Sequence, residues 1–136
     1  MSIHAALHKQ VADDAAVTAL VGNEVYQGKS PQTGNEHRVV HHLLTRPRTS
    51  HLNGRSGLTE VEFQIDVYAP TGGEREAITE AVTNALEVDG PAVWFGSVEI
   101  RRCWVVNERD EFPDEGDGRE TVRFRTRMEV TIWYIR

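Results

Sequence analysis

Apolar residues recur at every second position from Val61 to Tyr68, which is the period of a strand with one buried face. The side chains predicted to share that face are those of Val61, Phe63, Ile65 and Val67. Pro70 and the glycines that follow it are predicted to end the strand in a turn, because proline cannot donate to a strand ladder and glycine suits turn conformations.

The segment after this turn changes to the period of a helix. Its apolar positions fall on one stripe of a 3.6-residue repeat, namely Ala77, Ile78, Ala81, Val82, Ala85 and Leu86. The predicted outer face carries Thr79, Glu80, Thr83 and Asn84. Gly90 followed by Pro91 is expected to end the helix. Gly72 and Gly73 precede the helix, but Glu74 and Glu76 in its first turn repel an anion there and are predicted to complement the helix dipole.

Two shorter helical patterns open the chain. Ser2 is a suitable N-cap for a helix that buries Ile3, Ala6, Leu7 and Val11. Asp13 is predicted to cap a second short helical turn that carries Val17, Leu20 and Val21 and closes at Gly22. A short strand is expected at Val25–Tyr26, and longer ones at residues 38–45, 98–107 and 120–136. The pattern predicts one α+β domain over residues 1–136, a mostly antiparallel sheet of about four main strands with helices packed on it.

The composition is that of an ordinary soluble globular protein, with 39% apolar and 26% charged residues in 136. No run has the length of a membrane span and the N-terminus lacks signal-peptide order, so a cytosolic product is expected. The formal charge of -6 argues against a protein whose main role is to grip nucleic acid. The single cysteine, Cys103, excludes an internal disulfide and is expected to pack in the core.

The histidines are the residues whose spacing comes closest to that of a metal site. His4 and His8 have the i, i+4 spacing of helical metal ligands, but no motif places a third ligand, so a solvated helix face is the favoured interpretation. His41 and His42 are neighbours in a predicted strand and must point to opposite sides. The sequence also lacks the recognised catalytic and nucleotide-binding motifs. We therefore expect no metal, no cofactor and no enzyme activity.

Charge is segregated along the chain. Residues 37–59 contain no acidic residue but include Arg38, Arg46, Arg48 and Arg55, and are either a solvated loop or a contact surface for an acidic partner. Residues 107–120 are strongly acidic and are predicted to form a loop with a hairpin tip at residues 114–118. The acidic residues taken as interface candidates there are Asp110, Glu111, Asp114, Glu115 and Asp117. Their spacing does not fit a calcium loop.

Two further features each have two interpretations. Arg123, Arg125 and Arg127 alternate along the last predicted strand and are either a nucleic-acid platform or the wet face of a sheet, paired with carboxylates such as Glu62 and Glu129. The second interpretation is favoured. Trp94 and Phe95 are either part of the core, which is favoured, or an exposed anchor for a partner.

The central segment resembles the tail-completion family of long-tailed bacteriophages, also called tail terminator or head-to-tail joining proteins. The residues that carry the resemblance are Leu52-Asn53-Gly54, Ser56-Gly57-Leu58, Val61, Phe63 through Ala69 and Thr71, followed by the alanine-rich helix. The similarity extends upstream through Asp13 to Tyr26 and downstream to Trp133-Tyr134. The chain departs from the family pattern at Val93-Trp94-Phe95 and in the acidic residues 107–120.

The resemblance implies a structural virion subunit, assembled in the host cytoplasm, that forms a ring, usually of six copies, at the tail–head junction. Such a ring ends growth of the tail tube and joins the tail to head-completion or connector proteins, while DNA passes through its lumen. A ring needs two complementary patches on each subunit, and the basic and acidic segments are two such patches. The alternative is a stand-alone α+β binding module for a peptide or single-stranded nucleic acid.

Overall fold

The computed structural model describes residues 1–28, 37–45, 50–51, 54–55, 58–114 and 123–135. Its helices are α1 (Ile3–Ala12), α2 (Ala15–Val21) and α3 (Gly72–Leu86). Its strands are β1 (Val25–Gln27), β2 (Arg38–Thr45), β3 (Ser50–His51), β4 (Gly54–Arg55), β5 (Leu58–Ala69), β6 (Val88–Phe95), β7 (Val98–Asp114) and β8 (Arg123–Ile135). None of the described helices is long and apolar enough to cross a membrane.

Six strands form one sheet in the order β1-β2-β5-β8-β7-β6, and β3 pairs with β4 in a separate hairpin. Every pair in the large sheet is antiparallel except β1 with β2. The prediction of a mostly antiparallel α+β fold is confirmed, but the expected number of about four strands is wrong. The short strand expected at Val25–Tyr26 is β1 at one edge of the sheet, whereas β6 at the other edge was not predicted and contains the Val93–Phe95 cluster.

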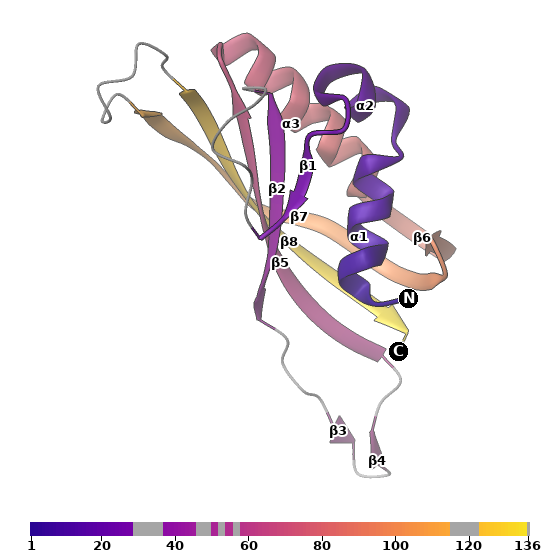
Figure 1. Ribbon diagram of the computed structural model, residues 1–136. Coiled ribbons are helices and arrows are strands. Elements are labelled where there is room, and N and C mark those ends of the chain that lie inside the picture. The colour runs from indigo at the N-terminus through magenta and orange to yellow at the C-terminus, as the bar shows by residue number, and fades with distance from the viewer. Residues whose placement is uncertain (29–36, 46–49, 52–53, 56–57, 115–122, 136) are drawn as a thin grey trace.

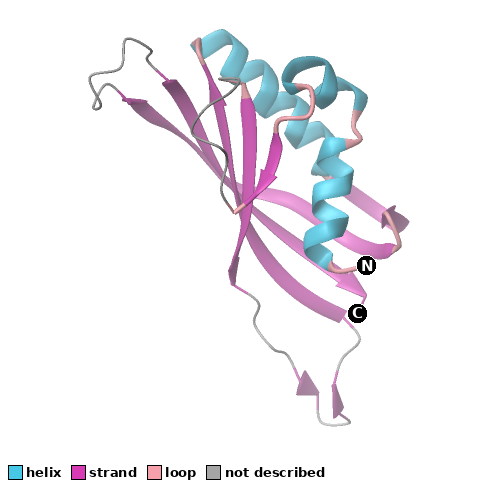
Figure 2. Ribbon diagram, in the orientation of Figure 1, coloured by secondary structure: helices cyan, strands magenta, loops and turns pink. Residues whose placement is uncertain are grey.

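All three helices lie on the same face of the large sheet (Figures 1 and 2). The predicted strand residues Val61, Phe63, Ile65 and Val67 are fully buried beneath them, together with Met128, Val130 and Ile132 of β8. The side chains of α1 and α3 that face this layer are Ile3, Ala6, Leu7, Val11, Ile78, Ala81, Val82, Ala85 and Leu86. One continuous core therefore joins the helices to the sheet.

Helix ends follow local chemistry, with some shifts from prediction. Ser2 caps α1 as expected, accepting a hydrogen bond from the Ala5 amide at 3.1 Å. The cap of α2 is Asp14 rather than Asp13, because the Asp14 carboxylate is the one that accepts from the Ala16 and Val17 amides. Val17 and Val21 of α2 are buried, whereas Leu20 is 39% exposed. Gly22 closes α2 with a positive φ of 62°.

Helix α3 differs from the prediction in which residues it buries and in where it ends. Thr71 is the N-cap, and its hydroxyl accepts from the Glu74 amide and donates to the Glu74 carboxylate. Thr79 was assigned to the outer face but is buried, which is possible because its hydroxyl donates to the Arg75 carbonyl at 2.8 Å. Ala77 is exposed instead. The helix ends at Leu86, and Gly90 and Pro91 lie within edge strand β6.

Strand β7 is longer than predicted at its C-terminal end. β7 continues to Asp114, so residues 107–114 are strand and not loop, while β8 begins at Arg123. The predicted hairpin tip at residues 114–118 falls almost entirely outside the described residues. Figure 1 shows the ends of β7 and β8 projecting beyond the helices, whereas β3 and β4 project from the opposite end of the molecule.

Candidate assembly surface

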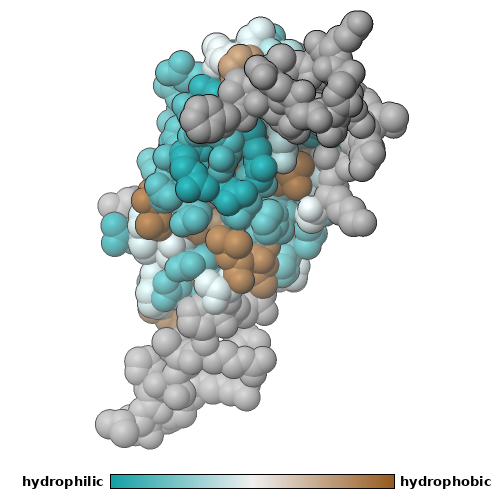
Figure 3. All heavy atoms as spheres, turned by 90° about the vertical axis from the view of Figure 1, so that its left-hand side faces the viewer, coloured by the Kyte–Doolittle hydropathy of each residue, from teal (hydrophilic) through white to brown (hydrophobic). Residues whose placement is uncertain are grey.

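The face of the large sheet that is not covered by helices carries both charged and apolar side chains among the described residues. We call it the outer face. Strand alternation places the even-numbered residues of β5 and the odd-numbered residues of β8 on it, because their neighbours point into the core. Figure 3, which looks at the side of the molecule opposite α1, shows a hydrophilic band with apolar groups gathered beside it.

Two ion pairs of the outer face meet at Asp66, which is only 4% exposed. Its carboxylate lies 3.2 Å from the Arg125 guanidinium and 3.9 Å from that of Arg127. The amide of Gln64 donates to both of its oxygens, at 3.1 and 3.2 Å. A buried carboxylate is tolerated only when it is paired in this way, so the network fixes both arginines in place.

Glu111 of β7 extends the network from the other side of β8. It lies 3.8 Å from Arg127 and 3.1 Å from Arg109. Burial of the Arg125 guanidinium works to lower its pKa, but the charge and hydrogen bond of Asp66, with Tyr68 and Glu111 adding to them, raise the pKa above its ordinary value. The favoured interpretation of this arginine row as a paired sheet face is confirmed for Arg125 and Arg127. Their partners are Asp66 and Glu111, however, and not Glu62 and Glu129.

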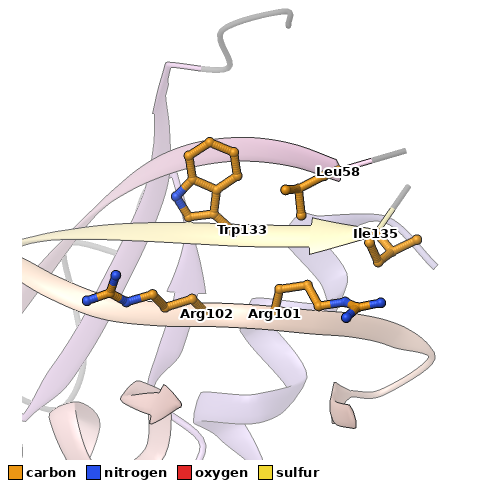
Figure 4. A pocket seen from close by; sticks show the side chains of 5 residues that line it. All are labelled: Leu58, Arg101, Arg102, Trp133 and Ile135. Carbon is orange, nitrogen blue, oxygen red and sulfur yellow. The ribbon is translucent and has the colours of Figure 1, made fainter. Parts of the chain in front are cut away.

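A shallow apolar groove of about 540 Å³ lies at the other end of the outer face. Leu58, Trp133 and Ile135 form its apolar walls, and Arg101 and Arg102 border it (Figure 4). The two arginines are consecutive, yet both reach the groove because the register of β7 shifts between Ile100 and Arg102. The guanidiniums point in opposite directions along β7, so they bracket the groove. None of these residues stood among the sequence-based candidates.

All three tryptophans of the chain lie on the outer face. Trp94 is opposite Glu99, Trp104 opposite Thr131 and Trp133 opposite Arg102, while their chain neighbours Phe95, Cys103 and Ile132 are in the core. The Arg102 guanidinium stacks on the Trp104 ring at 4.2 Å from its centroid. For Trp104 and Trp133, the sequence signal of an outward position was the strand alternation with their neighbours Cys103 and Ile132.

The predicted interface residues fall in different places. Phe95 is fully buried, as the favoured interpretation required, but Trp94 is 55% exposed, so its assignment to the core is wrong. Adjacent strand residues face opposite sides of a sheet, which separates the two aromatics. Asp110 points to the helix side, where it accepts from Arg75 at 3.1 Å and from Thr126 at 2.7 Å. Glu111 belongs to the network above.

The remaining candidates are only partly described. Arg46, Arg48, Glu115 and Asp117 lie outside the described residues. Arg55 belongs to β4 and Asp114 to β7, but their side chains are outside the described part of the structure. The structure therefore fixes the two strands that carry these charges, at opposite ends of the molecule (Figure 1).

Histidines meet between α1 and β2. His8 Nδ1 lies 2.9 Å from Nε2 of His41, whereas His4 Nδ1 lies 3.3 Å from the Gln27 amide. Within the described ranges, no group of three or more His, Cys, Asp or Glu side chains is arranged to hold a metal. Cys103 is buried, and burial raises the pKa of its thiol well above the usual range, as expected of a packing residue.

A sheet covered by helices on one side, with ion pairs and tryptophans on the other, defines a small α+β fold with one helix-free face. A family model described as tail completion protein gp17 matches residues 5–129 of this chain. The protein therefore belongs to this tail completion family, which gives it a structural role in a phage tail. The family resemblance seen in the sequence is thus confirmed.

Solved structures share the fold. A chain from the virion of a native gene transfer agent (GTA) particle superposes with a TM-score of 0.73 at 21% sequence identity, over 99% of this chain and 96% of that one. A second solved chain gives a TM-score of 0.63 at 16% identity, over 98% of this chain and 93% of its own length. No curated protein sequence matches.

Proposed function

We propose that the protein forms a ring, of six copies, at the head-proximal end of the tail tube. In this position it ends growth of the tube and joins the tail to head-completion or connector proteins, and genome DNA passes through its lumen. In this role the subunit needs no catalysis, metal or cofactor.

The observation that carries the proposal is the placement of oppositely charged segments at opposite ends of the molecule (Figure 1). β3 and β4 belong to the segment 37–59, which has no acidic residue, and the projecting end of β7 belongs to the acidic segment 107–120. A ring needs a heterologous contact, in which one patch of each copy meets a different patch of the next. Charge complementarity of this kind determines which surfaces bind each other and in which orientation.

The chemistry of the outer face also suits a DNA channel component. Arg125 and Arg127 are neutralised by Asp66 and Glu111 within the subunit, and the chain carries a net charge of -6. Phosphate binding depends on unpaired positive charge. A ring built from this subunit would let DNA pass without holding it.

The test is a double charge reversal, Arg46→Glu with Arg48→Glu, assayed in the presence of tails. We expect a normal melting temperature with loss of rings and of infectious particles, because the sequence predicts a loop in this segment and exposed charges of that kind contribute little to stability. Lys9→Glu on the exposed side of α1 is the control and should assemble normally. Rings and infectious tails at normal yield from the double variant would contradict the contact between the basic and acidic segments.

A second candidate function rests on the tryptophans and arginines at the apolar groove. Aromatic rings beside cations form stacking platforms for single-stranded nucleic acid, and an apolar groove also suits a peptide. As a stand-alone binding module, the isolated protein would bind such a ligand without assembling. The net negative charge and the paired arginines weigh against nucleic acid.

A further inference from the structure

The two edges of the large sheet have complementary outlines. On one edge, β6 pairs with β7 only as far as Cys103, and no described strand borders this side of β7 from Trp104 onward. On the other edge, β1 is three residues long and pairs only with Val39–His41 of β2. One edge therefore has a recess beyond the end of β6, and the other has a short projecting strand.

The recess exposes the backbone of β7. The Val105 amide points away from β8, since the Glu87 carboxylate on the side of β6 accepts from it at 3.4 Å. Beyond Val105, the described residues provide no backbone partner for β7 on this side. An open strand edge binds a further strand, and charged side chains such as those of Glu108 and Arg109 restrict which strand can pair. The recess therefore requires a partner strand with matching side chains.

The projecting strand lies at the same level of the sheet as the recess. The paired residues that cross the sheet at two successive levels are Gln27, His41, Ile65, Met128 and Glu108, and then Tyr26, Val40, Asp66, Arg127 and Arg109. β1 is parallel to β2, and the three pairings from β2 to β7 are antiparallel, so β1 and β7 run in opposite directions. Four strand spacings, roughly 19 Å at 4.8 Å each, separate them, so they cannot pair within one copy.

On the helix side of the sheet, the two strands carry groups that suit each other. Glu108 lies opposite the core residue Met128, is exposed, and has no cation paired with it among the described side chains. Asp110 on the same side is already held by Arg75. Gln27 is exposed, and its amide nitrogen lies 3.3 Å from His4 Nδ1. A neighbour's Glu108 would therefore meet an amide and an imidazole, which are groups that donate hydrogen bonds to a carboxylate.

On the outer face, the charges are also opposite. Arg109 is exposed and lies across from Arg127, and Glu111 is its described ion-pair partner. Tyr26 is half-buried, and its hydroxyl donates to the Glu24 carboxylate. A neighbour's Arg109 would meet an aromatic ring beside a carboxylate, and both attract a guanidinium.

We propose that β1 of one copy adds to β7 of the neighbouring copy as an antiparallel strand, with Tyr26 opposite Arg109 and Gln27 opposite Glu108. This inference rests on the proposed ring and names the surfaces that join its copies. A rotation relates neighbours in a ring, so the recess of each copy meets the projecting strand of the next in the same way. Because β2 lies beside β1 and opens the segment 37–59, the pairing also brings the acidic segment close to the basic one.

Disulfide trapping tests the pairing directly. The variant Tyr26→Cys with Arg109→Cys is oxidised in the presence of tails, because opposite residues of an antiparallel pair have Cα atoms about 4.5–5.5 Å apart, which is within disulfide reach. The native Cys103 is buried and does not compete. The matched control is Tyr26→Cys with Glu99→Cys, on the part of β7 that β6 covers. We expect a ladder of covalent oligomers up to the ring size from the first variant and none from the control.

The other outcomes separate this inference from the proposed function. Rings that form without a ladder would overturn the strand pairing and leave the ring intact. Equal ladders from the variant and the control would also overturn the pairing, because they would show that the disulfides do not depend on position. Absence of rings in every tail preparation, including unmodified protein, would remove the ring and the pairing together.

A charge exchange provides a second measurement. Gln27→Glu places two carboxylates opposite each other at every junction and should lower the yield of rings at least tenfold. Adding Glu108→Lys should restore at least half of that yield, because opposite charges then face each other. Melting temperatures verify that each variant is folded. A double variant that assembles no better than Gln27→Glu alone would overturn the proposed pairing.

Discussion

His8 Nδ1 lies 2.9 Å from His41 Nε2, across the contact between α1 and β2. One of these nitrogens must carry a hydrogen and the other must accept it, so the contact holds only while at least one ring is neutral. His41 is 1% exposed. Burial, followed by the nearby His8, His4 and His42, lowers its pKa to about 4.

Stability should therefore fall as the pH drops from 6.5 to 4. In this window the unfolded chain binds a proton at His41 that the folded protein does not, and the loss is complete below the folded pKa of about 4. A pKa shift of this size corresponds to roughly 3 kcal/mol of unfolding free energy. Urea unfolding at several pH values measures the slope, and His41→Gln should flatten it. An equally steep slope in His41→Gln would contradict this assignment.

Among the carboxylates of the outer face, Asp66 should contribute more to the stability of the protein than Glu129 does. Replacing it with Asn leaves Arg125 and Arg127 without their shared charge, and we expect a loss of about 2 kcal/mol, because the guanidiniums remain partly exposed. Glu129→Gln on the same face is the control and should change stability by less than about 0.5 kcal/mol. Chemical denaturation compares the two, and equal effects would remove the special role of Asp66.

Phe95 and Trp94 should behave differently despite being neighbours. Phe95→Ala removes a fully buried ring and should cost about 3–5 kcal/mol of unfolding free energy. Trp94→Ala removes a ring that is 55% exposed, and a change within about 1 kcal/mol is expected. Thermal melting of the two variants is the measurement. A large loss from Trp94→Ala would mean that its ring packs more closely than its exposure indicates.

The isolated protein should not bind single-stranded nucleic acid at physiological salt. The arginines of β8 that the structure describes are paired with carboxylates, and the net charge is negative. Titration of a labelled oligonucleotide at about 0.15 M salt tests this expectation. Micromolar binding that is lost when Arg123, Arg125 and Arg127 are changed to Ser would favour the binding-module alternative over the ring.

The Thr71 cap at the start of α3 leads to a local prediction. Thr71→Ala removes the hydroxyl that accepts from the Glu74 amide at 3.2 Å and should cost about 1 kcal/mol. Thr71→Ser keeps the oxygen and should restore most of that loss. A melting curve for each variant is the measurement. An unchanged melting temperature in Thr71→Ala would mean that water replaces the hydrogen bond of the cap without loss of stability.

The sequence by itself determined the elements whose apolar residues repeat with a clear period. The alternation from Val61 to Val67 requires a half-buried strand, and the stripe from Ile78 to Leu86 requires a helix, because each pattern buries one face only in that conformation. The bounds of β2 and the Ser2 cap were likewise local. These signals also identified the family, since its shared residues are the ones that build the fold.

Tertiary structure decided which residues meet. Asp66 rather than Glu62 or Glu129 pairs with Arg125 because strand register, set by long-range packing, brings the β5 position next to it. The edge strand that contains Gly90 and Pro91 was decided by pairing with β7, which offsets the local preference of those residues for a turn. The groove depends on a register shift at Arg101, and its walls come from β5, β7 and β8. No local pattern encodes such a surface, because its residues become neighbours only when the sheet assembles.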